Sequence, residues 1–78
     1  MNNLAIAFIL LNAEPGLESE VMKGLKNIEE VKEAHLVYGI YDIIARIETD
    51  NMRELKDVIA WKLRRLEKVR STYTMIVI

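Results

Sequence analysis

The chain has 78 residues, of which 51% are hydrophobic, 29% are charged and none is cysteine, with a formal net charge of −1. This length is typical of one small domain, and the apolar content with a single proline excludes an intrinsically disordered chain. The lack of cysteine excludes disulfides and thiolate metal sites. We therefore expect residues 1–78 to form one domain. Because a domain this small buries little surface and has no disulfides, we expect it to gain stability by associating with further copies.

Residues 3–11 form the first predicted element, a strand that is apolar on both alternating faces and therefore central in a sheet. This apolar stretch is too short to cross a bilayer. No basic residue precedes it, as one would in a secretory signal, so we expect a cytoplasmic protein without membrane contact. The sequence Asn-Ala-Glu-Pro-Gly at 12–16 is predicted to end the strand.

A helix of about three turns is predicted next, because apolar residues from Leu17 to Ile28 recur at helical spacing. A strand over residues 31–38 follows, in which charged residues interrupt the apolar pattern. Such charges protect an exposed edge from pairing with other chains, so we expect an edge strand.

Gly39 and Ile40 are predicted to turn the chain into a second central strand over residues 41–48, which is rich in isoleucine. A second helix is predicted from about Asn51 to Leu66, capped by the polar residues 49–51. Its expected buried stripe is Met52, Leu55, Ile59, Leu63 and Leu66. Trp61 lies nearly opposite this stripe, which leaves two interpretations open: a contact with another subunit, and simple partial exposure.

Acidic and basic residues are divided unevenly along the chain. Residues 1–50 carry nine acidic and four basic side chains, whereas residues 51–78 carry three acidic and seven basic ones. We interpret the basic excess as a complement to the helix dipole rather than a nucleic-acid patch, because no aromatic residues are interleaved with it. Its members are Lys62, Arg64, Arg65, Lys68 and Arg70.

A last strand is predicted over residues 69–78, which gives the order βαββαβ of an α+β, ferredoxin-like fold. Right-handed crossovers then place the first and third strands in the middle of a four-stranded antiparallel sheet, with both helices on one face. The other face is also apolar. We expect a second copy to cover it, sheet against sheet, in a two-fold dimer of the α+β barrel type.

The sequence offers little for catalysis. His35 is the only histidine, and it lies in a predicted strand without a partner nucleophile. No glycine-rich phosphate loop or dinucleotide fingerprint is present, since the three glycines are scattered. We therefore predict no catalytic residue, no metal site, no cofactor and no enzymatic activity.

The turn and the last strand carry the candidate site. Gly39 lies between two strands, where a positive φ or a close backbone approach is the usual requirement. Asp42 begins an otherwise apolar strand, so its carboxylate can bind an ammonium group while turn amides bind a carboxylate. In this interpretation, hydroxyl groups of the last strand line the same site. The alternative for Gly39 is that it only makes the turn, and the alternative for the hydroxyl groups is that they pair across strands. The hydroxyl residues are Ser71, Thr72 and Thr74.

The run Gly39-Ile40-Tyr41-Asp42 after a strand, the capped second helix and the ending Val69-Arg70-Ser71-Thr72-Tyr73-Thr74 resemble the effector-binding (RAM) domain of the Lrp/AsnC transcriptional regulators. The similarity extends from Ala5 to Ile78. It implies a domain that dimerises through its sheets, assembles into rings that are commonly octamers, and binds an amino acid between dimers. Gly39, Tyr41 and Asp42 are the site residues that it implies, with Ser71, Thr72 and Thr74 behind them.

Full-length regulators of this family carry a helix-turn-helix domain ahead of the RAM domain. The first predicted strand begins close to Met1, so the resemblance implies a stand-alone amino-acid sensor that does not bind DNA directly and that can assemble with full-length Lrp/AsnC regulators. Two other functions stay open: a small cofactor-free enzyme of the dimeric α+β barrel type, and a structural oligomerisation module without a ligand.

Overall fold

The structure, a computed structural model, describes residues 4–78. The predicted start of the first strand at Asn3 lies outside this part of the chain. The order βαββαβ is confirmed. Along the chain the elements are β1 (Ala5–Ala13), α1 (Glu18–Lys26), β2 (Val31–Leu36), β3 (Ile43–Thr49), α2 (Met52–Asp57), η1 (Val58–Lys62), η2 (Leu63–Arg65) and β4 (Val69–Ile76).

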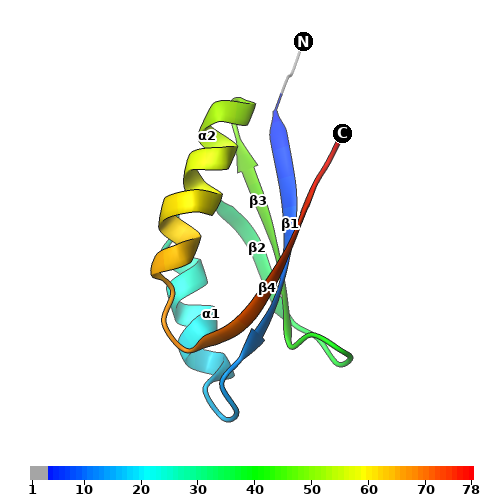
Figure 1. The fold of residues 1–78 in the computed structure, drawn as a ribbon, viewed down its shortest axis with the longest axis vertical. Coiled ribbons are helices and arrows are strands. Elements are labelled where there is room, and N and C mark those ends of the chain that lie inside the picture. Colours follow the sequence, from blue (N-terminus) through cyan, green and yellow to red (C-terminus); the bar gives the residue numbers. More distant parts are fainter. Residues whose placement is uncertain (1–3) are drawn as a thin grey trace.

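The four strands form one antiparallel sheet in the order β2-β3-β1-β4. Both helices lie on the same face of this sheet (Figure 1). The predicted fold is therefore confirmed, with β1 and β3 in the middle. The charged strand β2 is an edge strand, as expected, and β4 forms the other edge.

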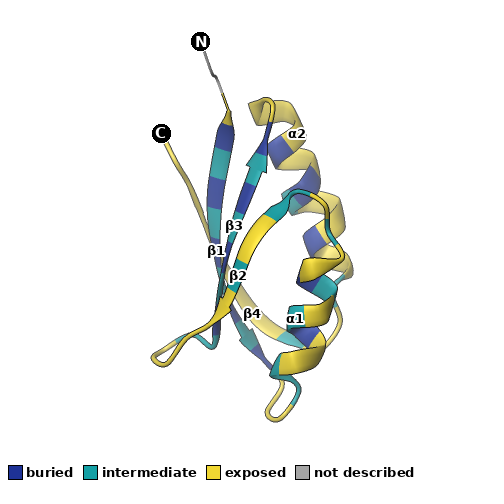
Figure 2. Cartoon of the chain, turned by 180° about the vertical axis from the view of Figure 1, so that it is seen from behind, coloured by how far each residue is buried: buried dark blue, intermediate teal, exposed yellow. Residues whose placement is uncertain are grey.

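The core lies between the sheet and the helices. Every second residue of β1 and β3 points toward the helices and is buried (Figure 2). This regular alternation excludes water from one face of the two central strands. The buried apolar residues are Ala5, Ala7, Ile9, Leu11, Ala13, Val21, Leu25, Ile43, Ala45, Ile47, Leu55, Val58 and Leu63.

No helix of residues 4–78 covers the opposite face of the sheet, which we call the open face (Figure 1). A charged row lies along its β2 side, where Arg46 donates to Glu33 Oε2 and to Glu48 Oε1, each at 2.8 Å. Apart from His35 on β2 and the pair of Asn12 and Ser71, the rest of the face is apolar and only partly buried or exposed. Its apolar residues are Ile6, Phe8, Leu10, Ile44, Tyr73 and Met75.

The second helix departs from the predicted pattern. After Asp57 it continues as a π-helical turn, η1, and a 3₁₀ turn, η2. Val58, outside the predicted stripe, is buried together with Leu63, because the i→i+5 bonding of the π turn brings residues five apart onto one side. Met52 was placed in the stripe but is 40% exposed, since the helix begins where the pairing of β1 with β3 ends at Ala5 and Thr49.

The predicted cap of this helix is confirmed. Asn51 Oδ1 accepts a hydrogen bond from the Glu54 N–H at 2.8 Å, and Glu54 Oε2 accepts one from the Asp50 N–H at 3.2 Å. Two backbone donors at the helix start are thereby satisfied. None of the helices within residues 4–78 has the length and apolar character needed to span a membrane.

Candidate ligand site at the end of the sheet

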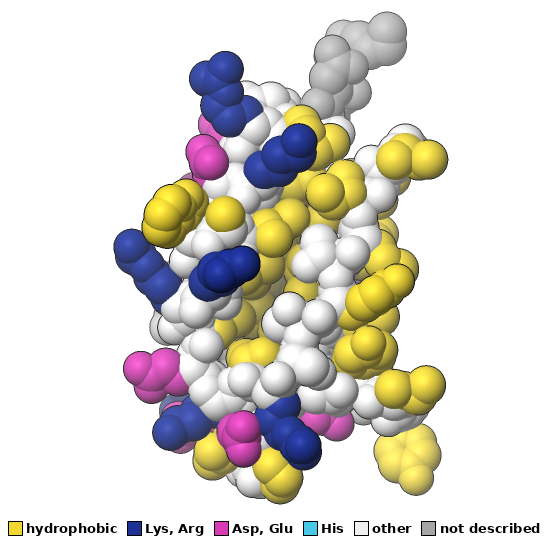
Figure 3. All heavy atoms as spheres, viewed as in Figure 1, with side chains coloured by type: hydrophobic (Ala, Val, Ile, Leu, Met, Phe, Trp, Pro, Cys, Tyr) yellow, Lys and Arg dark blue, Asp and Glu magenta, His cyan; other side chains and the backbone are white. Residues whose placement is uncertain are grey.

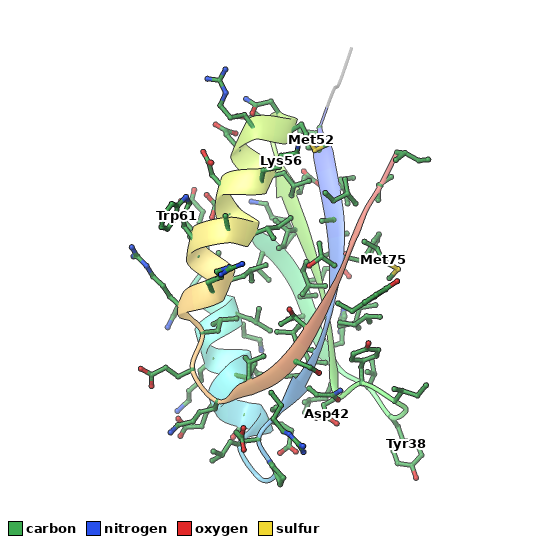
Figure 4. The ribbon with its side chains drawn as sticks, viewed as in Figure 1. Tyr38, Asp42, Met52, Lys56, Trp61 and Met75 are labelled. Carbon is green, nitrogen blue, oxygen red and sulfur yellow. The ribbon has the colours of Figure 1, made fainter. Side chains whose placement is uncertain are left out.

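The hairpin between β2 and β3 projects beyond the sheet, with Tyr38 at its tip (Figure 4). The prediction that Gly39 requires a positive φ or a close backbone approach is wrong. Its φ is not positive, and no atom beyond its chain neighbours lies within 4 Å of a Cβ placed there. The loop between Leu36 and Ile43 is long enough to reverse the chain without a residue in the left-handed (positive φ) conformation.

Asp42 extends the pairing of β1 with β3 by means of its side chain. Backbone pairing ends at Leu11 opposite Ile43, and the Asp42 N–H donates to the Leu11 carbonyl at 3.0 Å. Beyond that point, Asp42 Oδ2 accepts from the Ala13 N–H at 3.0 Å. This bond to a charged acceptor holds the carboxylate at the end of the sheet. The prediction that the first strand ends before Asn12 is wrong, because Asn12 and Ala13 still pair with Ser71 and Val69 of β4.

A β-bulge at the start of β4 places Arg70 at the same end of the sheet. Asn12 lies opposite Ser71, but the next pair is Ala13 opposite Val69, so Arg70 is an extra residue on β4. A bulge of this kind bends its strand and redirects a side chain, and bulges are over-represented beside functional sites.

These features surround a hollow of about 510 Å³ between the end of the sheet and the start of α1. Three charged side chains line it: Glu18, Asp42 and Arg70. On its wall, Asn12 Nδ2 donates to Ser71 Oγ at 3.3 Å. The remaining lining residues are Ala13, Pro15 and Ile40. The hollow thus offers both signs of charge, neutral hydrogen-bonding groups and a small apolar surface.

The structure divides the predicted site residues among separate places. Asp42 and Ser71 line the hollow. Thr72 and Thr74 share one face of β4, as expected, but it is the face toward the helices, where they line a different groove of about 250 Å³. Figure 3 shows hydrophobic side chains exposed along this groove between the helical layer and β4.

Tyr41 and Gly39 do not line the hollow either. The Tyr41 ring lies against the Tyr73 ring, with centroids 6.5 Å apart and planes at 28°. Tyr73 is opposite Leu10 on the open face, so Tyr41 extends the apolar part of that face. Gly39 lies in the exposed part of the hairpin.

Sequence reasoning missed Asn12, Glu18 and Arg70 as lining residues. Asn12 gave a usable signal, because it is a polar residue at the end of an apolar strand. In the sequence, Glu18 looks like an ordinary charge on a helix surface, and Arg70 looks like one more member of the basic cluster. The bulge that brings Arg70 to the hollow has no signature in the residues themselves.

A larger hollow of about 590 Å³ lies between α2 and the β2 side of the sheet. Lys62 Nζ donates to both carboxylate oxygens of Glu30 at 2.9 Å, and this pairing lowers the pKa of Glu30. Trp61, 66% exposed, lies on its rim (Figure 4). The other lining residues are Glu29, Lys32, Glu48, Thr49, Asp50, Glu54, Asp57 and Val58.

The excess of carboxylates in the larger hollow repels the carboxylate of an amino acid, so we place the candidate site in the hollow at Asp42. His35 is exposed, and its Nε2 lies 3.2 Å from Glu33 Oε1. Residues 4–78 contain no group of three or more histidine, aspartate or glutamate side chains arranged to hold a metal ion.

Three comparisons identify relatives of the chain. The family model described as "Lrp/AsnC ligand binding domain" matches residues 6–78. The chain is 37% identical over 76 residues to the HTH-type transcriptional regulator FL11 of Pyrococcus abyssi, with 94% of this chain and 48% of that protein covered. It is 36% identical over 73 residues to FL11 of Pyrococcus furiosus, with 94% and 48% covered.

Two solved structures are similar over nearly their whole length. FFRP-DM1 has a TM-score of 0.87 and 44% identity, with 95% of this chain and 99% of that chain covered. The hypothetical protein PHS023 from Pyrococcus horikoshii has a TM-score of 0.88 and 44% identity, with 95% and 89% covered. The chain spans about half the length of the curated relatives it matches. Its sequence, fold and element order together show that the chain belongs to the family of Lrp/AsnC ligand-binding domains.

Proposed function

We propose that the chain is an amino-acid-binding sensor and oligomerisation domain of Lrp/AsnC type, which modulates transcription or amino-acid metabolism. In this proposal the amino acid binds in the hollow at the end of the sheet, and further copies bind through the open face. Membership in a family of ligand-binding domains supports the general role. The specific site rests on the groups that line the hollow.

The observation that carries the proposal is the presence of Asp42 and Arg70 in one hollow. A free amino acid has an ammonium group and a carboxylate on the same carbon. Asp42 accepts from the ammonium group, and the Arg70 guanidinium donates to the carboxylate in a fork geometry. Within residues 4–78 neither side chain forms an ion pair, so no intramolecular charged group competes with the ligand.

The expected affinity is modest. Each charge-assisted hydrogen bond contributes about 1.5–3 kcal/mol. Association costs at least about 4 kcal/mol in lost translational and rotational freedom. Two or three such bonds with a small apolar contact therefore give a dissociation constant of roughly micromolar to millimolar. This range suits the sensing of a metabolite pool.

Two exposed apolar surfaces support oligomerisation. The open face packs against the same face of a second copy, which gives a two-fold dimer. The hairpin carries Leu36, Val37, Tyr38 and Ile40, all exposed. Because Ile40 also lines the hollow, a contact between dimers at the hairpin covers the bound amino acid. Dimers then close into a ring, with an octamer as the implied size, and full-length regulators of the family can join through the same open face.

Calorimetric titration with the common amino acids tests this proposal. We expect at least one to bind saturably below millimolar concentration. Asp42→Asn keeps an oxygen that accepts from the Ala13 N–H but removes the charge, so it should weaken binding about tenfold or more. Glu67→Gln, an exposed carboxylate outside the hollow, is the matched control and should bind as the wild type does.

The outcomes separate the candidate functions. If no amino acid binds at millimolar concentration, the sensor role is wrong, and an assembled particle in light scattering then indicates a structural module. If an amino acid binds equally well to wild type and Asp42→Asn, the site lies elsewhere on the molecule.

A further inference from the structure

We propose that Glu18 selects the ligand, and that the hollow takes an amino acid with a cationic side chain. This inference rests on the proposed amino-acid site and specifies its ligand class. Asp42 and Arg70 bind the groups common to all amino acids, so the side chain must be distinguished by the third charged group in the hollow.

The position of Glu18 supports this role. It is the first residue of α1, is only partly exposed and lines the hollow with Asp42 and Arg70. Glu20 lies in the same first turn but is exposed and does not line the hollow. A carboxylate in the first turn complements the helix dipole in either position. Only Glu18 also faces the space that a ligand would occupy.

The balance of charge in the hollow gives the ligand class. Two carboxylates, Glu18 and Asp42, and one guanidinium, Arg70, line it, so its charged groups sum to −1. A neutral zwitterion uses Asp42 and Arg70 and leaves Glu18 without a partner. Within residues 4–78 Glu18 forms no ion pair and no side-chain hydrogen bond. An amino acid of net charge +1 pairs all three groups and neutralises the site.

The neutral lining residues fit the stem of such a ligand. Pro15, Ala13 and Ile40 provide a narrow apolar surface. Methylene groups of a long basic side chain can pack on this surface while the terminal cation reaches a carboxylate. Asn12 Nδ2 donates to Ser71 Oγ, and neither side chain is charged, so Glu18 is the group that neutralises the terminal cation.

Calorimetry with L-lysine and L-norleucine tests the inference, because norleucine offers a comparable linear side chain without the terminal ammonium group. We expect wild type to bind lysine about tenfold or more tightly than norleucine, since one charge-assisted bond is added. Glu18→Gln should remove this preference by weakening lysine binding about tenfold or more. Glu20→Gln is the control on the same helix turn and should keep the preference for lysine.

The outcomes are distinguishable from failure of the proposed function. If norleucine binds as tightly as lysine to wild type, and Asp42→Asn weakens both, the amino-acid site stands and the selectivity claim is overturned. A lysine preference that survives Glu18→Gln overturns the role of Glu18. If neither ligand binds and no other amino acid does, the proposed function itself is wrong.

Discussion

In the proposed site, Asp42 combines a structural and a ligand-binding role in one carboxylate. One oxygen accepts from the Ala13 N–H and so fixes the group in place. The geometry of the site therefore does not depend on the ligand to order it, which lowers the cost of binding. Arg70 reaches the same hollow only because β4 contains an extra residue. Asp42 and Arg70 are thus each positioned where regular strand pairing ends or is interrupted.

At the residue scale, the pair of Glu30 and Lys62 predicts a dependence on pH. The hydrogen bonds from Lys62 lower the pKa of Glu30 in the folded chain below its unfolded value. A depressed carboxyl pKa stabilises the fold at neutral pH, and this contribution is lost as the pH falls through the folded pKa. Lys62→Met should raise the Glu30 pKa toward its ordinary value in a carbon-13 NMR titration.

The same substitution should lower the free energy of unfolding at neutral pH by less than about 1 kcal/mol, because the pair is partly exposed. The loss should vanish in acid, where Glu30 is protonated in both variants. Lys56→Met, which removes an exposed lysine of the same helix, is the control and should leave the Glu30 pKa unchanged. An unchanged pKa in Lys62→Met would contradict the pairing.

At the scale of elements, α1 approaches the end of the second helix at Gly24. A Cβ at this position would lie 2.7 Å from Leu66 Cδ2, so the side chain of Leu66 has to move. We expect Gly24→Ala to show a coupling energy with Leu66→Ala of about 1 kcal/mol or more, measured by urea unfolding in a double-mutant cycle. In the Leu66→Ala background, Gly24→Ala should stabilise the helix by up to about 1 kcal/mol. Additive effects would show that the two elements do not meet there.

The strands illustrate what the sequence can predict. Continuous apolar runs in β1 and β3 indicated central strands, and the charges of β2 indicated an edge, because burial selects these patterns directly. The π turn at Val58–Lys62 and the bulge at Arg70 escaped prediction. Both insert one residue into a regular element, and the choice depends on tertiary packing rather than on local residue type. Thr72 and Thr74 were predicted to line the site at the turn, but their face of β4 points toward the helices, and the residues alone do not show which face that is.

At the scale of the whole molecule, the open face is the predicted dimer surface. Phe8 lies near its centre, paired with Arg46 on β3 and Met75 on β4. Arg46 already donates to Glu33 and Glu48, so Phe8→Asp would add a third carboxylate beside it and bury that charge in the dimer interface. We therefore expect the dimer dissociation constant to rise about 100-fold or more. Light scattering across a dilution series measures this change.

Lys23→Asp is the control, because it reverses a charge on the exposed side of α1, away from the open face. It should leave the mass of the assembly in light scattering unchanged. A Phe8→Asp variant that is folded by circular dichroism and keeps the wild-type mass would show that copies associate through another surface. The exposed side of Trp61 is then the next surface to change.

The central claim, that an amino acid binds at the end of the sheet, is tested most directly by backbone amide NMR during a titration with L-lysine. We predict saturable shifts at Asn12, Asp42 and Ser71, with little change at Thr74 on the other face of β4 or at Trp61 beside the larger hollow. Shifts confined to Trp61 and its neighbours, or no shifts at millimolar concentration of any amino acid, would contradict the account.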